Sequence, residues 1–142
     1  MGDFIINAMV YGMLFLVMFG FHCLADYPLQ GEFLAVNKSK NLFVLLCHCA
    51  TYAIVVTLGF LFLDYKSSFV LDNWLVVYIV LFASHILIDI TKCNVRKQIQ
   101  KDYPDLNVEG TKGHKIDVRT YYIDQAAHMV IILILLLGGG SI

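Results

Sequence analysis

The sequence predicts an all-α integral membrane protein, in which four transmembrane helices form a bundle within a single domain over residues 1–137. Of the 142 residues, 59% are hydrophobic and only 15% are charged, whereas soluble globular domains have about 25% charged residues. Four apolar stretches are long enough to cross a hydrocarbon core, which takes about 20 residues of helix. The net charge of −1 gives no indication of nucleic-acid binding.

The apolar stretches set the bounds of the expected helices. These helices cover about 4–26, 42–63, 70–91 and 120–137. The first is expected to persist, because Asp3 and the lack of a basic stretch before it do not fit a cleaved signal peptide. A long cytoplasmic loop is expected over 92–119, either disordered, folded as a lid, or with 94–103 continuing the third helix. The glycine-rich residues 138–142 are predicted to be a flexible tail.

The distribution of basic residues predicts the orientation in the membrane. Lys66 alone lies in the connection after the second helix. The other nine basic residues lie in the first and third connections: Lys38, Lys40, Lys92, Arg96, Lys97, Lys101, Lys112, Lys115 and Arg119. Basic connections stay on the cytoplasmic side, so both termini should lie outside. The expected location is the inner (cytoplasmic) membrane, with membrane lipids as partners and a homo-oligomer as an open alternative.

A repeated spacing of histidine and aspartate is the strongest functional signal. Three predicted helices each carry such a pair four residues apart: His22 and Asp26, His85 and Asp89, and Asp124 and His128. This spacing places both side chains on one face of a helix, one turn apart. The order is reversed on the fourth helix, as the opposite direction of that helix requires. All three pairs therefore share one depth near the cytoplasmic side, and His48 on the second helix reaches a similar level.

Ionised carboxylates at this depth indicate a bound cation. A carboxylate at the centre of a membrane helix costs about 2.5–3.5 kcal/mol on insertion scales. Imidazole and carboxylate together suit a divalent metal, with zinc as the first choice and iron or manganese as alternatives, in a site for one or two ions. The predicted metal ligands are His22, Asp26, His85, Asp89, Asp124 and His128. The predicted catalytic residues are Asp26, Asp89, Asp124 and His48, with His48 as a ligand or a base.

Other polar residues are assigned supporting or structural roles. Gln30, Gln125 and Lys92 are expected to support the metal ligands. The four cysteines are expected to be reduced and to pack among apolar residues; Cys47 and Cys49 flank His48, where thiolates would favour zinc. His114 is expected in a solvated loop. The structural alternatives for the His and Asp pairs are hydrogen bonds within each helix, a polar packing network, or a proton path.

Three segments resemble a known family. FHCLADYPLQGEFLAVNKSKN, HILIDITK and YYIDQAAHMV look like the small membrane proteins of bacteria and phages grouped as domain of unknown function 3307. The motifs map onto His22, Asp26, Leu29, Gln30, Asn37, Lys38, His85, Asp89, Asp124, Gln125 and His128. The resemblance implies a bacterial, phage or prophage membrane protein and carries no established activity. In pattern the chain is also similar to predicted membrane-bound metal-dependent hydrolases.

The leading hypothesis is a metal-dependent hydrolase of the cytoplasmic leaflet, acting on a lipid-linked or phosphate-containing substrate. One alternative is a protein that binds or transports metal ions or protons. The other alternative is a non-enzymatic phage membrane protein that modifies the host envelope, with the histidines and aspartates only holding the bundle together.

Overall fold

The computed structural model describes residues 2–66 and 73–139, and these residues form helices joined by short connections. The helices are α1 (Gly2–Asp26), α2 (Gly31–Asn37), α3 (Leu42–Lys66), α4 (Trp74–Asp102) and α5 (Lys112–Gly139). Four of them, α1, α3, α4 and α5, are long and apolar enough to cross a membrane. The predicted all-α class and the four membrane-spanning helices are confirmed.

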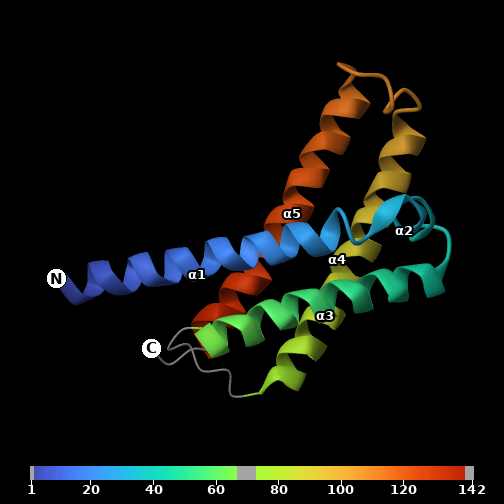
Figure 1. Cartoon of the computed structure of the whole chain (residues 1–142). Coiled ribbons are helices and arrows are strands. Elements are labelled where there is room, and N and C mark those ends of the chain that lie inside the picture. Colours follow the sequence, from blue (N-terminus) through green and yellow to red (C-terminus); the bar gives the residue numbers. More distant parts are fainter. Residues whose placement is uncertain (1, 67–72, 140–142) are drawn as a thin grey trace.

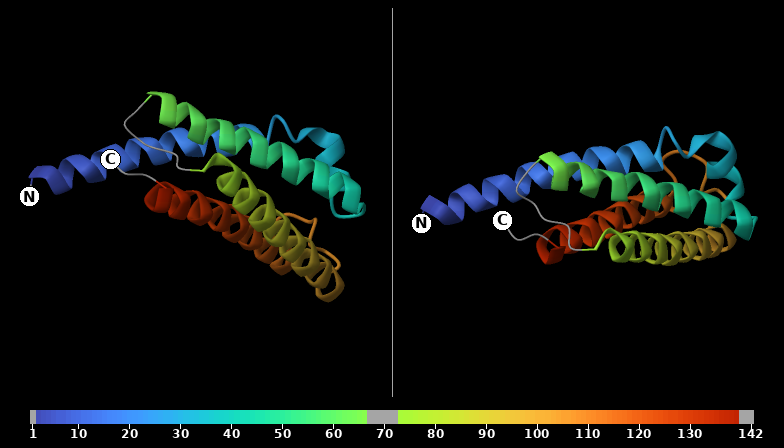
Figure 2. Two further views of the ribbon diagram at one scale, coloured as in Figure 1. Left: turned by 90° about the horizontal axis from the view of Figure 1, so that it is seen from below. Right: turned by 60° about the horizontal axis from the view of Figure 1, so that its bottom comes forward.

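The four long helices form a closed ring of contacts. Helix α1 packs against α3, α3 against α4, α4 against α5, and α5 back against α1. Figure 1 shows α1 and α3 running side by side, with the α4–α5 hairpin crossing them obliquely. The views in Figure 2 show the same two layers and the start of α1 projecting beyond the other helices. Helix α2 and the α4–α5 connection lie at the opposite end of the bundle from the start of α1.

The half of the bundle toward the start of α1 has an apolar core. Its buried side chains come from all four long helices: Leu14, Met18, Ala25, Tyr52, Ala53, Val56, Phe60, Leu63, Val77, Leu81, Ile132 and Leu136. Many outward-facing apolar side chains remain exposed, as expected for helices whose outer surface meets lipid. Apart from Thr57, the buried polar residues gather at the other end of this core, toward α2.

A short helix that the sequence did not predict follows α1. Helix α1 ends at Asp26, and Pro28 then prevents a regular continuation because it has no backbone N–H to donate. Gly31 adopts φ +61°, a left-handed conformation that glycine tolerates without strain, and α2 starts there. None of the residues of α2 is buried. The helix therefore has no buried face that a helical spacing of apolar residues would have revealed in the sequence. The helix ends at Lys38, whose side chain turns back toward the bundle.

The long cytoplasmic loop expected over 92–119 is largely helical. Helix α4 continues to Asp102 and α5 begins at Lys112, which leaves a nine-residue connection over 103–111. The residues after Lys92 mix polar and apolar types without glycine or proline until Pro104, so nothing in them stops the helix. Thr111 caps α5 by accepting a hydrogen bond from the backbone N–H of His114 at 3.2 Å. The hairpin therefore extends beyond the polar layer as two packed helices.

The remaining helix ends agree only in part with the expected bounds. Helix α4 begins at Trp74 because the Asn73 side chain accepts hydrogen bonds from the backbone N–H groups of Leu75 and Val76. The expected start at residue 70 falls among residues 70–72, which lie outside the described part of the chain. Helix α5 extends to Gly139, so the expected tail begins later than 138, and 140–142 are not described.

A close approach between α1 and α3 leads to a first prediction. A Cβ added at Gly59 would lie 2.7 Å from Phe21 Cγ and 3.1 Å from Met18 Sδ. We expect Gly59→Ala to lower the free energy of unfolding by about 1–3 kcal/mol, because overpacking must push α1 away. Reversible unfolding by sodium dodecyl sulfate in mixed micelles measures this change. Gly20→Ala on α1 is the control, since no atom lies within 4 Å of its added Cβ, and equal losses in both variants would contradict the prediction.

Candidate metal centre

The predicted histidines and aspartates lie together in the interior, in what we call the polar layer. It consists of His22 and Asp26 from α1, His48 from α3, His85 and Asp89 from α4, and Asp124 and His128 from α5. Every member is buried, with at most 8% of its surface exposed. Burial without compensating partners would be costly for so many polar groups. The arrangement of their nitrogen and oxygen atoms therefore decides what the layer can bind.

Three overlapping groups in the layer have the geometry to hold a metal ion. They are Asp26, His48 and His85; Cys49, His85 and Asp89; and Asp89, Asp124 and His128. Within each group the ligand atoms lie within 4.8 Å of one another. His85 belongs to the first two groups and Asp89 to the last two. Because these residues are shared, the three groups form one continuous cluster of potential ligands for one ion or two neighbouring ions.

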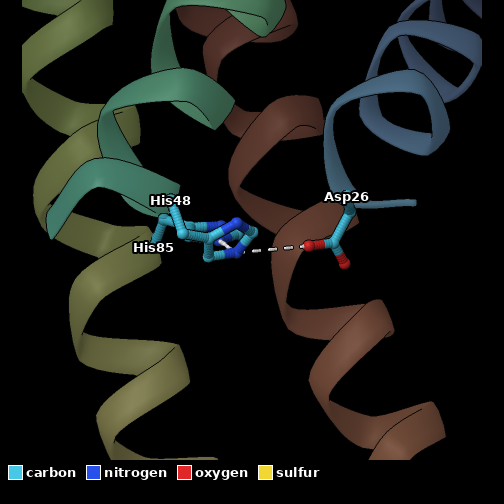
Figure 3. Close-up of side chains that lie close together, drawn as sticks. All are labelled: Asp26, His48 and His85. Carbon is cyan, nitrogen blue, oxygen red and sulfur yellow. Dashed lines mark hydrogen bonds and ion pairs between the residues drawn. The ribbon is translucent and has the colours of Figure 1, made fainter. Parts of the chain in front are cut away.

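In the first group, electron-pair donors converge on His48. Its Nε2 lies 2.9 Å from His85 Nε2 and 3.5 Å from Asp26 Oδ1, as Figure 3 shows. The same nitrogen lies 3.3 Å from Asp89 Oδ2. A neutral imidazole carries one proton, so hydrogen bonds between these four groups cannot satisfy all the facing lone pairs. A cation at their centre would.

The third group contains lone pairs that are ready to bind an ion. His128 Nδ1 lies 2.8 Å from the backbone oxygen of Asp124. Because a carbonyl oxygen can only accept a hydrogen bond, Nδ1 of the neutral ring carries the proton and Nε2 keeps its lone pair. His128 Nε2 and Asp124 Oδ1 are both buried and have no hydrogen-bond partner among the described residues. A backbone carbonyl that fixes the tautomer in this way is a common feature of histidine metal ligands.

Cys49 is buried, as a packing role requires, and also lies close to potential metal ligands. Its Sγ belongs to the second group, with His85 and Asp89, and the residue is fully buried. Cys47 is only partly buried and belongs to none of the three groups. All four cysteines are free thiols, as expected.

Lys38 enters the layer from the C-terminal end of α2 and was not among the predicted site residues. Its Nζ lies 2.9 Å from Asp89 Oδ2 and donates to His48 Nε2 at 3.1 Å. With the Gln30 amide turned so that both of its polar atoms find partners, Gln30 Oε1 accepts from the same ammonium at 2.9 Å. The one indication in the sequence of a role for Lys38 was its position in the NKSKN segment, which is part of the family resemblance. The ammonium shows that the chain itself places a cation beside Asp89.

Gln125 connects the first and last helices across the layer. Its amide nitrogen donates to Asp26 Oδ2 and to Asp124 Oδ2, each at 3.1 Å. Its oxygen therefore accepts from His22 Nε2 at 2.9 Å. His22 Nδ1 is then an acceptor and receives the Tyr52 hydroxyl at 3.0 Å. Both nitrogens of His22 are thus in hydrogen bonds and outside the three groups, and its role as a metal ligand stays a prediction.

Two tyrosines that were not among the predicted site residues complete the packing around the layer. The Tyr52 ring stacks on His85 with 3.8 Å between the ring centroids; its position four residues after His48 was the signal available in the sequence. The Tyr27 hydroxyl donates to Gln125 Oε1 at 3.2 Å and also contacts the Tyr121 hydroxyl. Burial, together with the hydrogen bond to Tyr121, raises the pKa of Tyr27, so its phenol remains protonated and able to donate.

Lys92 closes the layer on the α4–α5 side. Its Nζ lies 2.5 Å from Asp124 Oδ2, and its supporting role for the metal ligands stays a prediction. Beside this ion pair, a groove of about 390 Å³ runs between α4 and α5. Apart from Lys92 and Asp124 its walls are mainly apolar, with Leu87, Ile88, Val95 and Ile123 among them. Through Asp124 the groove reaches the edge of the layer from the side of the α4–α5 hairpin.

His114 lies apart from the layer, at the start of α5. It belongs to none of the candidate groups. Instead of the solvated loop expected for it, His114 occupies the first turn of a helix and is partly buried. It is the one histidine of the five in this chain that can be replaced without touching the cluster, and so it serves as a control below.

Comparison with known proteins identifies the family. The sequence model of the family described as "Protein of unknown function (DUF3307)" matches residues 13–140. No curated protein is significantly similar to the chain, and no solved structure is either. The match covers the second half of α1, the other three long helices and every member of the polar layer. The chain therefore belongs to the DUF3307 family.

Proposed function

We propose that the polar layer binds one or two divalent metal ions and that the protein is a metal-dependent hydrolase of the cytoplasmic leaflet. The convergence of His48 Nε2, His85 Nε2, Asp26 Oδ1 and Asp89 Oδ2 carries the proposal, because these buried lone pairs lack enough protons to satisfy one another. Zinc fits two imidazoles and a carboxylate in a site that keeps one position open. Iron and manganese fit the same donor types.

The residues divide into two ligand sets and a source of proton transfer. Asp26, His48 and His85 would hold one ion, and Asp89, Asp124 and His128 a second. A divalent ion supplies a water that ionises near neutral pH and a positive charge for the substrate oxygen. If only one ion is bound, a carboxylate that is not a ligand, or His48 if it is not a ligand, would take the proton from that water. The water oxygen would then bond to the phosphorus while the bond from phosphorus to the leaving oxygen breaks, and the same base would return its proton to that leaving oxygen.

The surroundings of the layer favour an amphiphilic, phosphate-containing substrate. The groove between α4 and α5 offers an apolar route for an acyl chain, and it ends at the charged Lys92 and Asp124. We assign the end of the bundle that holds α2 to the cytoplasm, because the basic residues are concentrated at that end. The layer would then lie close to the headgroups of the cytoplasmic leaflet.

A transport role receives less support from the same structure. Beyond the layer, the core among the described residues is apolar apart from Thr57, with Met18, Phe60, Leu81, Ile132 and Leu136 all fully or almost fully buried. An ion or proton would need polar groups through this half of the bundle. The layer is therefore better suited to bind an ion than to pass one onward.

The proposal is tested by measuring bound metal and phosphate release on the same protein. The full chain, purified in detergent without a histidine tag, should contain at least one divalent ion per chain by elemental mass spectrometry. It should release phosphate from phosphatidate in mixed micelles or from para-nitrophenyl phosphate. Removal of metal with a chelator should abolish release, and adding back the ion should restore it.

His114→Ala is the matched control for this test. It removes an imidazole outside the layer and should leave both metal content and phosphate release unchanged. A folded wild-type chain that binds no metal after reloading with zinc, iron or manganese would overturn the metal centre. Bound metal without any hydrolysis would leave the centre in place and remove the hydrolase assignment.

A further inference from the structure

A second opening reaches the polar layer from the α2 side and has the opposite character to the groove. It is a pocket of about 180 Å³ between the α2–α3 connection, the start of α3 and the middle of α4. Its polar lining is Lys38, Ser39, Lys40, Asn41, Asn94 and Lys97. The volume equals that of roughly six liquid waters, at about 30 Å³ each. This is enough for one phosphate group with its first hydrogen-bond partners.

The charge in this pocket has one sign. Among the described residues that line it, every charged one is a lysine. Lys40 and Lys97 form no ion pair with another described residue, so their ammonium groups remain available to a ligand. Asn41 and Asn94 add amide groups that can donate hydrogen bonds. The pocket also faces the start of the 25-residue helix α3, whose dipole adds to the attraction for an anion.

Lys38 joins the pocket to the candidate metal centre. The residue lines the pocket, while its ammonium contacts Asp89 Oδ2 at 2.9 Å and His48 Nε2 at 3.1 Å. Cys93, another lining residue, follows Asp89 by four positions on α4, one helical turn or about 5.4 Å along the axis. An anion in the pocket would therefore sit about one turn from the carboxylate shared by two of the candidate groups.

We propose that this pocket binds the phosphate group of a phosphate ester and presents it to the polar layer. The inference deepens the proposed function, since it names the group that would reach the metal. Lys40 and Lys97 hold the phosphate oxygens, and Lys38 contacts the phosphate from the side of the layer. The phosphate source is either a lipid headgroup or a soluble ester, because both present the same oxygens to the lysines.

Calorimetric titration with inorganic phosphate tests the pocket. The full chain in detergent should bind phosphate, and Lys97→Gln or Lys40→Gln should weaken binding at least about tenfold, as expected for the loss of a charge-assisted hydrogen bond. Both lysines are exposed, so the variants should fold and keep the metal content of the wild type. Lys101→Gln is the matched control, because Lys101 is exposed one turn further along α4 and does not line the pocket.

The outcomes separate the pocket from the metal centre. If a folded, metal-containing wild type binds no phosphate, or if Lys101→Gln weakens binding as much as Lys97→Gln, the pocket proposal is overturned and the metal centre stands. If phosphate binds but metal does not, the pocket is supported while the proposed hydrolase falls. Titrations in nanodiscs of phosphatidylcholine, with or without phosphatidate, identify the source. Competition by phosphatidate supports a lipid headgroup, and unchanged binding supports a soluble ester.

Discussion

Replacing His85 with alanine is expected to weaken metal binding by about a hundredfold or more and to abolish phosphate release. His85 belongs to two of the three candidate groups, so its loss removes a ligand from both. A zinc site with four ligands binds its ion with about 10–16 kcal/mol, and removing one ligand forfeits a large share of that free energy. Elemental mass spectrometry after dialysis against a weak chelator gives the metal content, and a competition titration gives the affinity.

Asp124→Ala extends the same measurement to the other side of the layer. It removes a ligand from the Asp89, Asp124 and His128 group while leaving Asp26, His48 and His85 intact. Loss of all metal in both variants would indicate one shared ion, whereas loss of half in each would indicate two ions. Full retention of metal in His85→Ala, in a chain that is folded by circular dichroism, would contradict the site.

Replacing Asp89 with alanine is expected to destabilise the metal-free chain by about 3–5 kcal/mol. The Asp89 side chain is 2% exposed and the Lys38 side chain 12%, so the variant leaves an ammonium nearly buried without its counter-charge. The free energy of unfolding is measured by reversible titration with sodium dodecyl sulfate, after chelation to exclude a contribution from bound metal.

A double variant and an exposed ion pair provide the controls. Lys38→Met combined with Asp89→Leu should recover most of the lost stability, because apolar side chains often replace a buried ion pair without loss. Arg96→Ala breaks the pair with Asp117, whose side chains are 56% and 25% exposed, and should cost less than about 1 kcal/mol. An Asp89→Ala cost as small as that of Arg96→Ala would show that Lys38 does not depend on Asp89.

Much of the bundle could be predicted because the relevant signals are local. Long apolar stretches marked the four membrane-spanning helices, since a helix must satisfy its backbone hydrogen bonds within lipid. The four-residue spacing placed His85 and Asp89 on one face of α4, and both are buried in the layer. The continuation of α4 agrees with one of the alternatives expected for residues 94–103. Helix α2 and the early start of α5 were missed because their residues have no strong apolar period.

The sequence by itself determined that this protein crosses the membrane as helices and that three helices carry a histidine and an aspartate on one face. Only the tertiary structure decided which of these side chains converge. It paired the Nδ1 lone pair of His22 with the Tyr52 hydroxyl and its Nε2–H with the Gln125 oxygen. It also brought Cys49 into a candidate group and turned Lys38 back onto Asp89. Spacing along a helix fixes the face of a side chain, whereas the packing and rotation of neighbouring helices fix its partners across the bundle.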